Sequence, residues 1–388
     1  MRVAQVSPLM ESVPPQLYGG TERVVSFLTE ELVALGHEVT LFASGDSVTR
    51  AKLVACAPRA LRLDRSCVDA TAHHVRMLDE VCRRAHSFDV IHFHIDYLHF
   101  PLSPALGVPH LTTLHGRQDI PDLAPLYRTY AREPLVSISD AQRRPLPDAN
   151  WQATVYHGLP RDRFQFHPGP GEYLAFLGRV SPEKRVDRAI DIAVRLDMPL
   201  KIAAKIDNAD QAYFEREIEP RLDHPLIEFV GEIDERGKDS FLGQAAALLF
   251  PIDWPEPFGL VMIEAMACGT PVVAFRCGSV PEVMDDGASG FVVDDLDQAV
   301  DATRRALTLS RALCRQTFER RFLARRMAED YLRVYRRLAN ADAPSLHRDR
   351  AAGARMESSA ACGIAAIHPN DATTALTGDD DGKPAEAD

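Results

Sequence analysis

Short apolar segments alternate with amphipathic ones over the first 160 residues. The segment VAQVSPL (3–9) predicts a buried strand, YGGTE (18–22) a glycine turn, and VTLFA (39–43) the next strand. Between them, apolar residues recur at helical spacing at Val24, Val25, Leu28, Leu32, Val33 and Leu35. A strand–helix–strand unit with short connections predicts a parallel sheet. Further strands are expected at 89–94, 110–115 and 135–139.

A second series with the same alternation begins near position 172. Its expected strands are 173–178, 200–205, 227–231, 247–251, 271–275 and 290–293, with a helix at 186–196. Prolines and glycines gather at 158–171, as is typical of an interdomain linker. The pattern therefore predicts two α/β domains, 1–160 and 172–320, that face each other across a cleft. Ligands of such sheets bind beyond the carboxyl ends of the strands.

The residue composition changes twice in the last 80 or so residues of the sequence, at about 310 and at 341. A long basic segment predicts one helix over about 310–338, of which 321–340 is expected to return to the first domain. Residues 341–388 are rich in Ala, Asp, Gly, Pro and Ser, with almost no large apolar side chains. Such a segment cannot bury enough surface to offset its ordering entropy, so a disordered tail is expected.

Composition narrows the possible functions. The net charge of −12 argues against a general nucleic-acid binder. No stretch has the roughly 18 apolar residues of a membrane span, and the first residues make a poor signal peptide, so a cytoplasmic location is expected. The seven cysteines form no CxxC pair, which favours buried thiols in a reducing compartment over disulfides or a zinc site.

The segment PIDWPEPFGLVMIEAMACGTPVVAF (251–275) carries the strongest chemical signal. A helix is expected from about Phe258 to Cys268, with Glu256 just before it and Glu264 inside it. The amides of Phe258, Gly259 and Leu260 then point out of the helix N-terminus, where anions and hydroxyls bind readily. Alternatively, Glu256 is only a favourable charge at a helix start and Glu264 a solvated residue. The apolar neighbours of Glu264 argue against full solvation.

In the form EPFGLVMIEAMACGTPVV, this E-x7-E element resembles the nucleotide-sugar site of retaining glycosyltransferases of family 4, which have the GT-B fold. The segments YGGTERVV, TLHG, SIS, GRVSPEK, FVGEI and GSVPEVMDDGASGFVV match the family in order, so the resemblance covers about 1–338. It implies two Rossmann-like domains around a central cleft and metal-independent transfer of a sugar with retention of configuration.

The resemblance also implies individual roles. Glu264 is expected to bind the ribose hydroxyls and Glu256 a hydroxyl of the donor sugar, assisted by the amides at 258–260. Arg179 and Lys184, in GRVSPEK, match the pair that holds the diphosphate. A guanidinium grips phosphate oxygens bidentately and a lysine adds a point charge. Outside this pattern, an Arg and a Lys in a loop are usually a solvated turn.

Three further positions come from the first half of the chain. The family places the histidine that matches His115 near the donor sugar, although a strand-end histidine is more often structural. Gly19 and Gly20 follow the first strand, in a loop that the family uses near the diphosphate or an acceptor phosphate. Glycine lets the backbone approach a ligand closely. The alternative is a plain turn.

Two further groups of polar residues stand outside the motifs above. His92 and His94 alternate on one strand, with Asp96 and His99 nearby. A metal site there is disfavoured because no known ligand spacing is present, and a lining of the acceptor side is expected instead. The motif SDAQR (139–143) resembles the family pattern but receives no role.

The resemblance leaves donor and acceptor less well defined. Ala203, Ala204 and Lys205 stand where many relatives carry glycines. The segments IAAKID, PIDWPEPFGL and YGGTERVV are similar to a subgroup of UDP-glucose:tetrahydrobiopterin glucosyltransferases, so UDP-glucose is the expected donor. The acceptor is a small molecule, a lipid or a glycan, and peripheral membrane contact is compatible with it. No cofactor is expected. The alternatives are a non-catalytic nucleotide-sugar-binding protein and an epimerase- or phosphorylase-like enzyme of the same fold.

Overall fold

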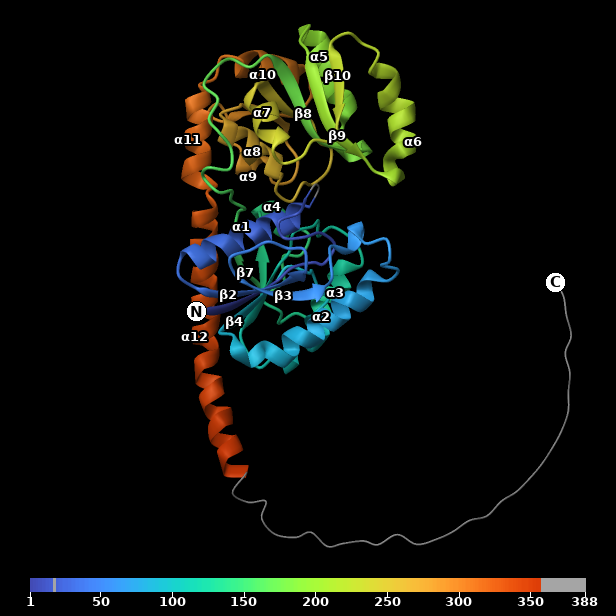
Figure 1. Cartoon of the computed structure of the whole chain (residues 1–388). Helices are drawn as coiled ribbons and strands as arrows, with labels where there is room; N and C mark the ends of the chain where they lie inside the picture. The colour runs from blue at the N-terminus through green and yellow to red at the C-terminus, as the bar shows by residue number, and fades with distance from the viewer. Residues whose placement is uncertain (17–18, 357–388) are drawn as a thin grey trace, which may run out of the picture. The chain divides into compact units, whose positions relative to one another are not determined.

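Two parallel sheets, each flanked by helices, make up most of the protein (Figure 1). The computed structural model describes residues 1–16 and 19–356. Residues Met1–Asp342 form one compact unit that holds both sheets, and Ala343–Asp388 form a separate unit. The predicted fold class, α/β with two Rossmann-like domains, is confirmed.

The first domain has a seven-stranded sheet in the order β3-β2-β1-β4-β5-β6-β7. Its strands are β1 (Arg2–Val6), β2 (Glu38–Ser44), β3 (Lys52–Ala57), β4 (Val90–Phe93), β5 (His110–Thr113), β6 (Leu135–Ser137) and β7 (Trp151–Thr154). Its α-helices are α1 (Gly20–Ala34), α2 (Ala70–Arg84), α3 (Leu123–Thr129) and α4 (Asp140–Arg143).

The second domain has a six-stranded sheet in the order β10-β9-β8-β11-β12-β13. Its strands are β8 (Tyr173–Val180), β9 (Leu200–Ile206), β10 (Ile227–Gly231), β11 (Ala245–Phe250), β12 (Val272–Phe275) and β13 (Gly290–Val293). Its helices include the 3-10 turn η4 (Pro182–Lys184), α5 (Val186–Leu196), α6 (Gln211–Tyr213), α7 (Gly237–Gly243), α8 (Leu260–Cys268), α9 (Val280–Val283), α10 (Leu296–Ala306) and α11 (Arg311–Arg321).

The apolar segments predicted as strands are strands, and the pattern missed two others, β3 and β7. Both lie at the edges of the first sheet, where only one neighbour pairs with them. Their side chains are mostly half-buried or exposed, whereas β4 and β11 are buried throughout. An edge strand does not need a continuous apolar run, and WQAT (151–154) has none.

In each sheet the strand order reverses beside the strand that comes first in the chain. The reversal lies between β1 and β4 in the first sheet and between β8 and β11 in the second. The crevice outside the carboxyl ends of the strands at such a point is where open α/β sheets bind ligands. The loops at this edge of each sheet are therefore the positions for a site.

The basic segment predicted as one helix over 310–338 is two helices, which corrects that prediction. Helix α11 ends before Phe322, whose side chain is fully buried in the core of the second domain. The chain then pairs with the linker: the Leu159 amide donates to the Phe322 carbonyl (2.9 Å) and the Ala324 amide to the Leu159 carbonyl (2.8 Å). Burying Phe322 and engaging its carbonyl in this pairing ends the first helix.

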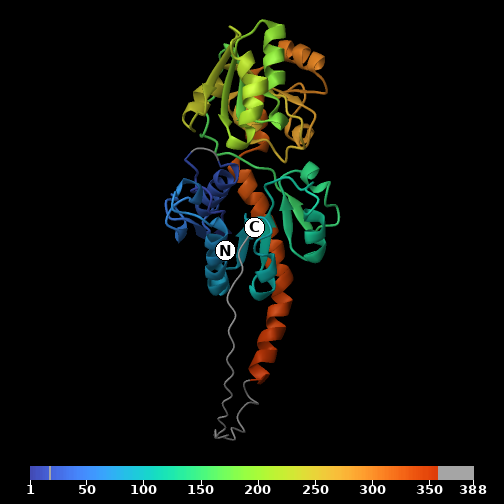
Figure 2. The same cartoon turned by 90° about the vertical axis from the view of Figure 1, so that its right-hand side faces the viewer.

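The first part of helix α12 (Ala324–Met356), up to Asp342, lies along the first domain in both views (Figures 1 and 2). Met327, Tyr331, Leu332 and Tyr335 pack into the same core as Val3 of β1. Its backbone stays helical over 341–356, a part of the segment predicted to be disordered, because propagating an existing helix is far easier than nucleating one. The remainder of that segment, 357–388, lies outside the described residues.

Two findings concern cysteines and membrane spans. Six of the seven cysteines lie in the described part of the chain, and all six are free thiols. Among the described residues, no helix has both the length and the apolar character that crossing a bilayer requires.

Candidate functional site

All ten predicted site residues line one cavity of about 500 Å³. The loops after β1, β5, β8 and β11 and the start of α8 form much of its wall. The ten residues are Gly19, Gly20, His115, Arg179, Lys184, Glu256, Phe258, Gly259, Leu260 and Glu264. Residues separated by up to 245 positions in the sequence therefore meet at the carboxyl ends of the two sheets.

Lys184 and Glu256 form an ion pair inside this cavity. The Lys184 ammonium group in η4 donates to Glu256 Oε2 at 2.5 Å, and the Trp254 indole N–H donates to the same oxygen at 3.1 Å. The Lys184 nitrogen also lies 4.7 Å from the centre of the Trp254 ring, within cation–π range. Two independent contacts thus hold the Glu256 carboxylate in place before the start of α8.

Arg179, at the end of β8, is surrounded by carboxylates. Its guanidinium donates to Glu183 at 2.5 Å and lies 3.5 Å from Asp207 and 3.6 Å from Asp210. The sequence led us to expect a cation aimed at a diphosphate, whereas the structure shows a cation already shared among acids. A guanidinium has five N–H donors, so it can hold Glu183 and still donate to a phosphate oxygen.

Glu264 lies inside α8 with 3% of its surface exposed, so it is not a solvated residue. Its carboxylate accepts a hydrogen bond from Lys238 at 3.1 Å. Lys238 also binds Glu235 at 2.8 Å, and Glu235 binds Arg23 of the first domain at 2.6 Å. These contacts form a chain of alternating charges from the buried helix α8 to the first turn of α1.

Gly259 precedes α8 with a φ of 80°, a conformation that glycine adopts without steric cost. A Cβ atom at this position would lie 2.7 Å from Met262 Cε and 3.2 Å from a Phe250 ring carbon. The left-handed backbone conformation therefore favours glycine here, whereas the contact with the terminal methyl of Met262 could be relieved by a movement of that side chain. The turn places the first amides of α8, which have no acceptor within the helix, at the cavity wall.

Gly20 begins α1 on the opposite wall. A Cβ atom built there would lie 3.7 Å from Leu260 Cδ1, so the glycine loop of the first domain and the start of α8 are nearly in contact. Gly19, just before it, has a φ of 157°, and a Cβ atom there would clash with Pro15 at 2.8 Å. The glycine loop therefore lies close to the second domain, while its expected approach to a phosphate stays a prediction.

His115 follows β5 and is held by two other histidines. Its Nε2 lies 2.9 Å from His94 Nδ1, and its ring stacks on that of His157 with centroids 5.4 Å apart. Burial lowers the pKa of His115 to about 3. Burial also lowers the pKa of His94 and His157 well below the usual value. The imidazoles are therefore neutral at ordinary pH.

The other histidines of β4 differ from the expectation. His92 and His94 do share a face, with ring centroids 4.0 Å apart, but both lie behind the cavity wall and not on it. His99 points elsewhere, stacks on Phe93 and bonds to Thr112 Oγ1 at 2.8 Å. The expected lining of the acceptor side by these residues is therefore wrong. In the described part of the chain, no group of three or more His, Cys, Asp or Glu could hold a metal ion.

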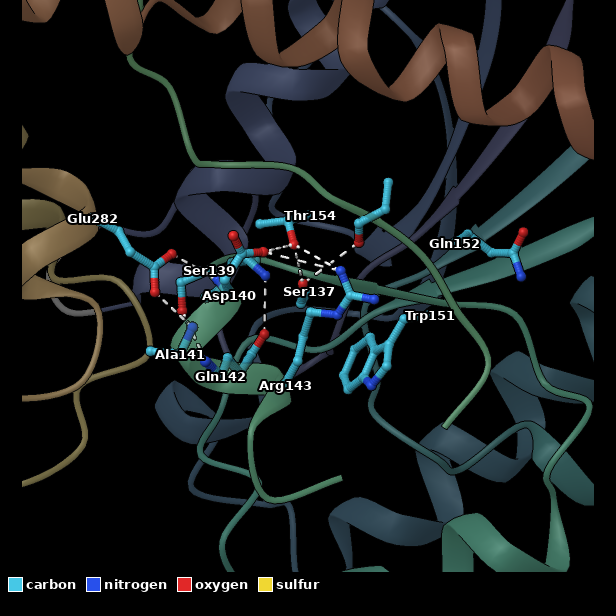
Figure 3. Close-up of polar contacts among 12 residues, drawn as sticks. Ser137, Ser139, Asp140, Ala141, Gln142, Arg143, Trp151, Gln152, Thr154 and Glu282 are labelled. Carbon is cyan, nitrogen blue, oxygen red and sulfur yellow. Dashed lines mark hydrogen bonds and ion pairs between the residues drawn. The ribbon is translucent and has the colours of Figure 1, made fainter. Parts of the chain in front are cut away.

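The motif at 139–143 joins the two domains (Figure 3). The Glu282 carboxylate, from α9, accepts hydrogen bonds from the amides of Asp140 (2.7 Å) and Ala141 (2.6 Å) at the start of α4. On the same helix, Asp140 accepts from the Thr154 hydroxyl at 2.5 Å, and Arg143 donates to that hydroxyl at 3.2 Å. This motif thus has a structural contact role.

The polar cavity residues to which the sequence analysis gave no site role include Glu22, Lys205, Glu232 and Lys238. Glu22 lies in the first turn of α1 with 5% of its surface exposed, and burial raises its pKa. It belongs to the YGGTE turn, so its place directly after two site glycines was a usable signal. Lys238 lies in a segment without any pattern, and its position depends on tertiary structure alone.

Two family models match the chain. Residues 18–153 match "Glycosyltransferase Family 4" and residues 160–320 match "Glycosyl transferases group 1". A phosphatidyl-myo-inositol mannosyltransferase of Mycobacterium leprae is 25% identical over 382 residues, which cover 87% of this chain and 97% of that protein. A D-inositol 3-phosphate glycosyltransferase of Mycolicibacterium smegmatis is 30% identical over 154 residues, 39% of this chain and 34% of that one.

The chain is also similar to solved glycosyltransferase structures. AviGT4, a glycosyltransferase involved in avilamycin A biosynthesis, is 26% identical with a TM-score of 0.68, over 88% of this chain and 98% of that chain. Anabaena Alr3699/HepE in complex with UDP and glucose has the same fold, with a TM-score of 0.67 at 17% identity over 87% of this chain and all of that one.

The fold and these matches define the chain as a glycosyltransferase with the GT-B fold. Its first domain is a Glycosyltransferase Family 4 domain, and its second is a domain of the glycosyl transferases group 1 family.

Proposed function

We propose that this glycosyltransferase transfers glucose from UDP-glucose to an acceptor hydroxyl, with retention of the anomeric configuration and without a metal ion. The observation that carries the proposal is the meeting of Glu256, Glu264, Arg179 and Lys184 at one cavity between the carboxyl ends of two sheets. A cytoplasmic location remains part of the proposal.

In this proposal the second domain holds the nucleotide. Glu264 accepts hydrogen bonds from the ribose hydroxyls, since a carboxylate can accept several donors besides Lys238. Arg179 and Lys184 hold the diphosphate and stabilise the charge that develops on it as the sugar leaves, which is the role a metal ion performs in other enzymes. An ammonium group has three donors, so Lys184 can bind Glu256 and a phosphate oxygen together.

Retention follows from a front-face substitution. A double displacement needs a carboxylate beside the anomeric carbon, and Glu256 and Glu264 are assigned to the sugar and the ribose. The acceptor oxygen then forms its bond to the anomeric carbon on the face from which the diphosphate departs, and the diphosphate takes the acceptor's proton. His115 orients the sugar and is not an obligatory base.

A thermal-shift series tests the donor. UDP-glucose at 100 times its dissociation constant should stabilise the protein by about 2.7 kcal/mol. GDP-mannose and ADP-glucose at the same concentration should stabilise it less. The Glu264→Gln variant, which keeps the shape of the side chain, should lose most of the UDP-glucose shift. A larger shift with GDP-mannose would reject the proposed donor.

Proton NMR of the first product tests the reaction. An α-linked donor should give an α-linked product, and turnover should survive EDTA. The acceptors to compare are a reduced pterin, which the sequence similarity suggests, a lipid and an oligosaccharide. A β-linked first product would reject retention, and loss of turnover in EDTA that magnesium restores would reject metal independence. An epimerised nucleotide sugar, or transfer to inorganic phosphate, would favour the alternative enzyme classes.

A further inference from the structure

A row of buried polar groups runs from His115 to helix α12. His115 Nε2 lies 2.9 Å from His94 Nδ1, and His94 Nε2 lies 2.8 Å from Gln5 Oε1 in β1. Gln5 Nε2 donates to the Tyr335 hydroxyl of α12 at 3.1 Å, and that hydroxyl lies 2.8 Å from His92 Nδ1. The side chains of Gln5, His92, His94 and Tyr335 are at most 2% exposed.

The row continues on the far side of His92. His92 Nε2 lies 2.7 Å from Thr113 Oγ1, which lies 2.9 Å from the Tyr331 hydroxyl. Tyr331 and Tyr335 are one turn apart on α12, and both are fully buried. Tyr335 contacts the segment that leads to His115, whereas Tyr331 terminates the other end of the row.

The hydrogen positions along the row follow from the Gln5 amide. Its oxygen can only accept, so His94 donates from Nε2, and a neutral His94 then accepts at Nδ1. His115 consequently donates from Nε2 to His94, and its own Nδ1 carries a lone pair. At the other end of the amide, Gln5 donates to Tyr335, and Tyr335 donates to His92 Nδ1. With this assignment, each hydrogen-bond donor from His115 to His92 faces an acceptor.

Among the ring nitrogens of this row in the described part of the chain, only His115 Nδ1 lacks a partner; Nδ1 of His157, which stacks on His115 outside the row, also lacks one. A buried polar atom without a partner is costly, so such atoms often belong to functional sites. His115 also lines the cavity, whereas His94 and His92 do not.

We propose that Gln5, held by Tyr335, is a positioning residue that fixes His115 as the neutral tautomer protonated on Nε2, so that Nδ1 acts as a hydrogen-bond acceptor for a hydroxyl of the donor sugar. Helix α12 follows the second domain in the chain, and through Tyr335 it thereby fixes the tautomer of His115 in the first domain. This inference rests on the proposed donor site, but the tautomer itself does not.

Nitrogen-15 NMR of the full-length protein, labelled at histidine, tests the tautomer without a substrate. Wild-type His115 should show a protonated Nε2 and a bare Nδ1. The Gln5→Met variant, which keeps the volume but cannot accept from His94, should give a mixture of tautomers. Its kcat with UDP-glucose should fall about tenfold, by analogy with other partners that orient site histidines, with the donor KM changed less than twofold.

Two tyrosine variants provide a matched pair in case Gln5→Met does not fold. Tyr335→Phe and Tyr331→Phe each remove one buried hydroxyl from the same helix, so they should lower the melting temperature alike. Only Tyr335→Phe should lower kcat and broaden the His115 tautomer signal. Equal kcat losses in both variants, or an unchanged His115 tautomer in Gln5→Met, would overturn the inference. If wild-type protein does not turn over UDP-glucose, the proposed donor is wrong while the NMR comparison still decides the tautomer.

Discussion

On the cavity wall formed by the second domain, charged groups are held by opposite charges. Lys184 is bound to Glu256, Arg179 to Glu183, and Lys238 to Glu264. The first domain also lines the cavity with the charged residues Glu22, Arg23 and Arg62. In the part of its wall around His115, called the neutral wall below, His115 belongs to a group of imidazoles that burial keeps neutral. The second wall suits a diphosphate, and the neutral wall suits the uncharged hydroxyls of a sugar. The two walls should therefore respond differently to loss of charge and to acid.

The largest effect should come from removing a cation from the charged wall. Arg179→Ala should lower turnover about 10²–10³-fold, by analogy with the loss of a preorganised donor to a developing charge. It also leaves Glu183, Asp207 and Asp210 without their shared cation. Steady-state kinetics measure the change. Arg195→Ala, which breaks an exposed ion pair with Asp297, is the control and should behave as wild type. If Arg179→Ala showed wild-type kinetics, the proposal that Arg179 binds the diphosphate would be rejected.

Lowering the pH should reduce the free energy of unfolding through the buried histidines of the neutral wall. The folded pKa of His115 is about 3, well below the ordinary value of 6.5, so the unfolded state binds the extra proton between these values. Stability is therefore complete above about pH 6.5 and falls as the pH drops below it. Each such histidine contributes about 1.4 kcal/mol per pH unit in that range. Urea unfolding at pH 7.5, 6.5 and 5.5 measures the slope, which should decrease in His115→Gln. A free energy of unfolding that does not change over this range would contradict the neutral state.

A smaller effect should follow from loosening the contact that holds the walls together. Glu282→Ala removes the acceptor of the Asp140 and Ala141 amides (Figure 3). The free energy of unfolding should fall by about 1.5–3 kcal/mol, because a hydrogen bond to a charged group contributes about that much. Glu329→Ala, which breaks an exposed pair with Arg325, should cost no more than about 0.5 kcal/mol. Equal losses in both variants would show that the interdomain contact adds nothing beyond a surface pair.

The smallest effect should come from the end of the chain. Among the helix side chains that the structure describes, Leu338 is the last that packs against the first-domain core. A chain ending at Asn340 should therefore match the full chain in melting temperature and turnover. Aggregation or loss of turnover would show that part of 341–388 contributes to folding or to sugar transfer.

The sequence predicted the charged wall better than the neutral one. Glu256, Glu264, Arg179 and Lys184 lie in short motifs beside buried strands, so their convergence could be expected from the order of the strands. The row behind His115 joins residues up to 330 positions apart, which no local pattern relates. The partners of Arg179 and Glu264 were missed for the same reason. The break at Phe322 and the edge strand β7 depend on tertiary contacts, whereas the apolar run of β3, LVACA (53–57), was a usable signal.

The paired segments around Leu159 and Leu323 have a consequence for engineering. The chain leaves the first domain and returns to it at adjacent points, joined by hydrogen bonds of 2.9 and 2.8 Å. A Cβ atom at Gly158 would lie 2.5 Å from the Leu323 carbonyl oxygen, so the two segments pass each other at backbone distance. The second domain is thus an insertion whose two ends are neighbours. A recombinant enzyme could exchange this domain for that of another GT-B protein with only two junctions, while β1 and α12 of the recipient stay together.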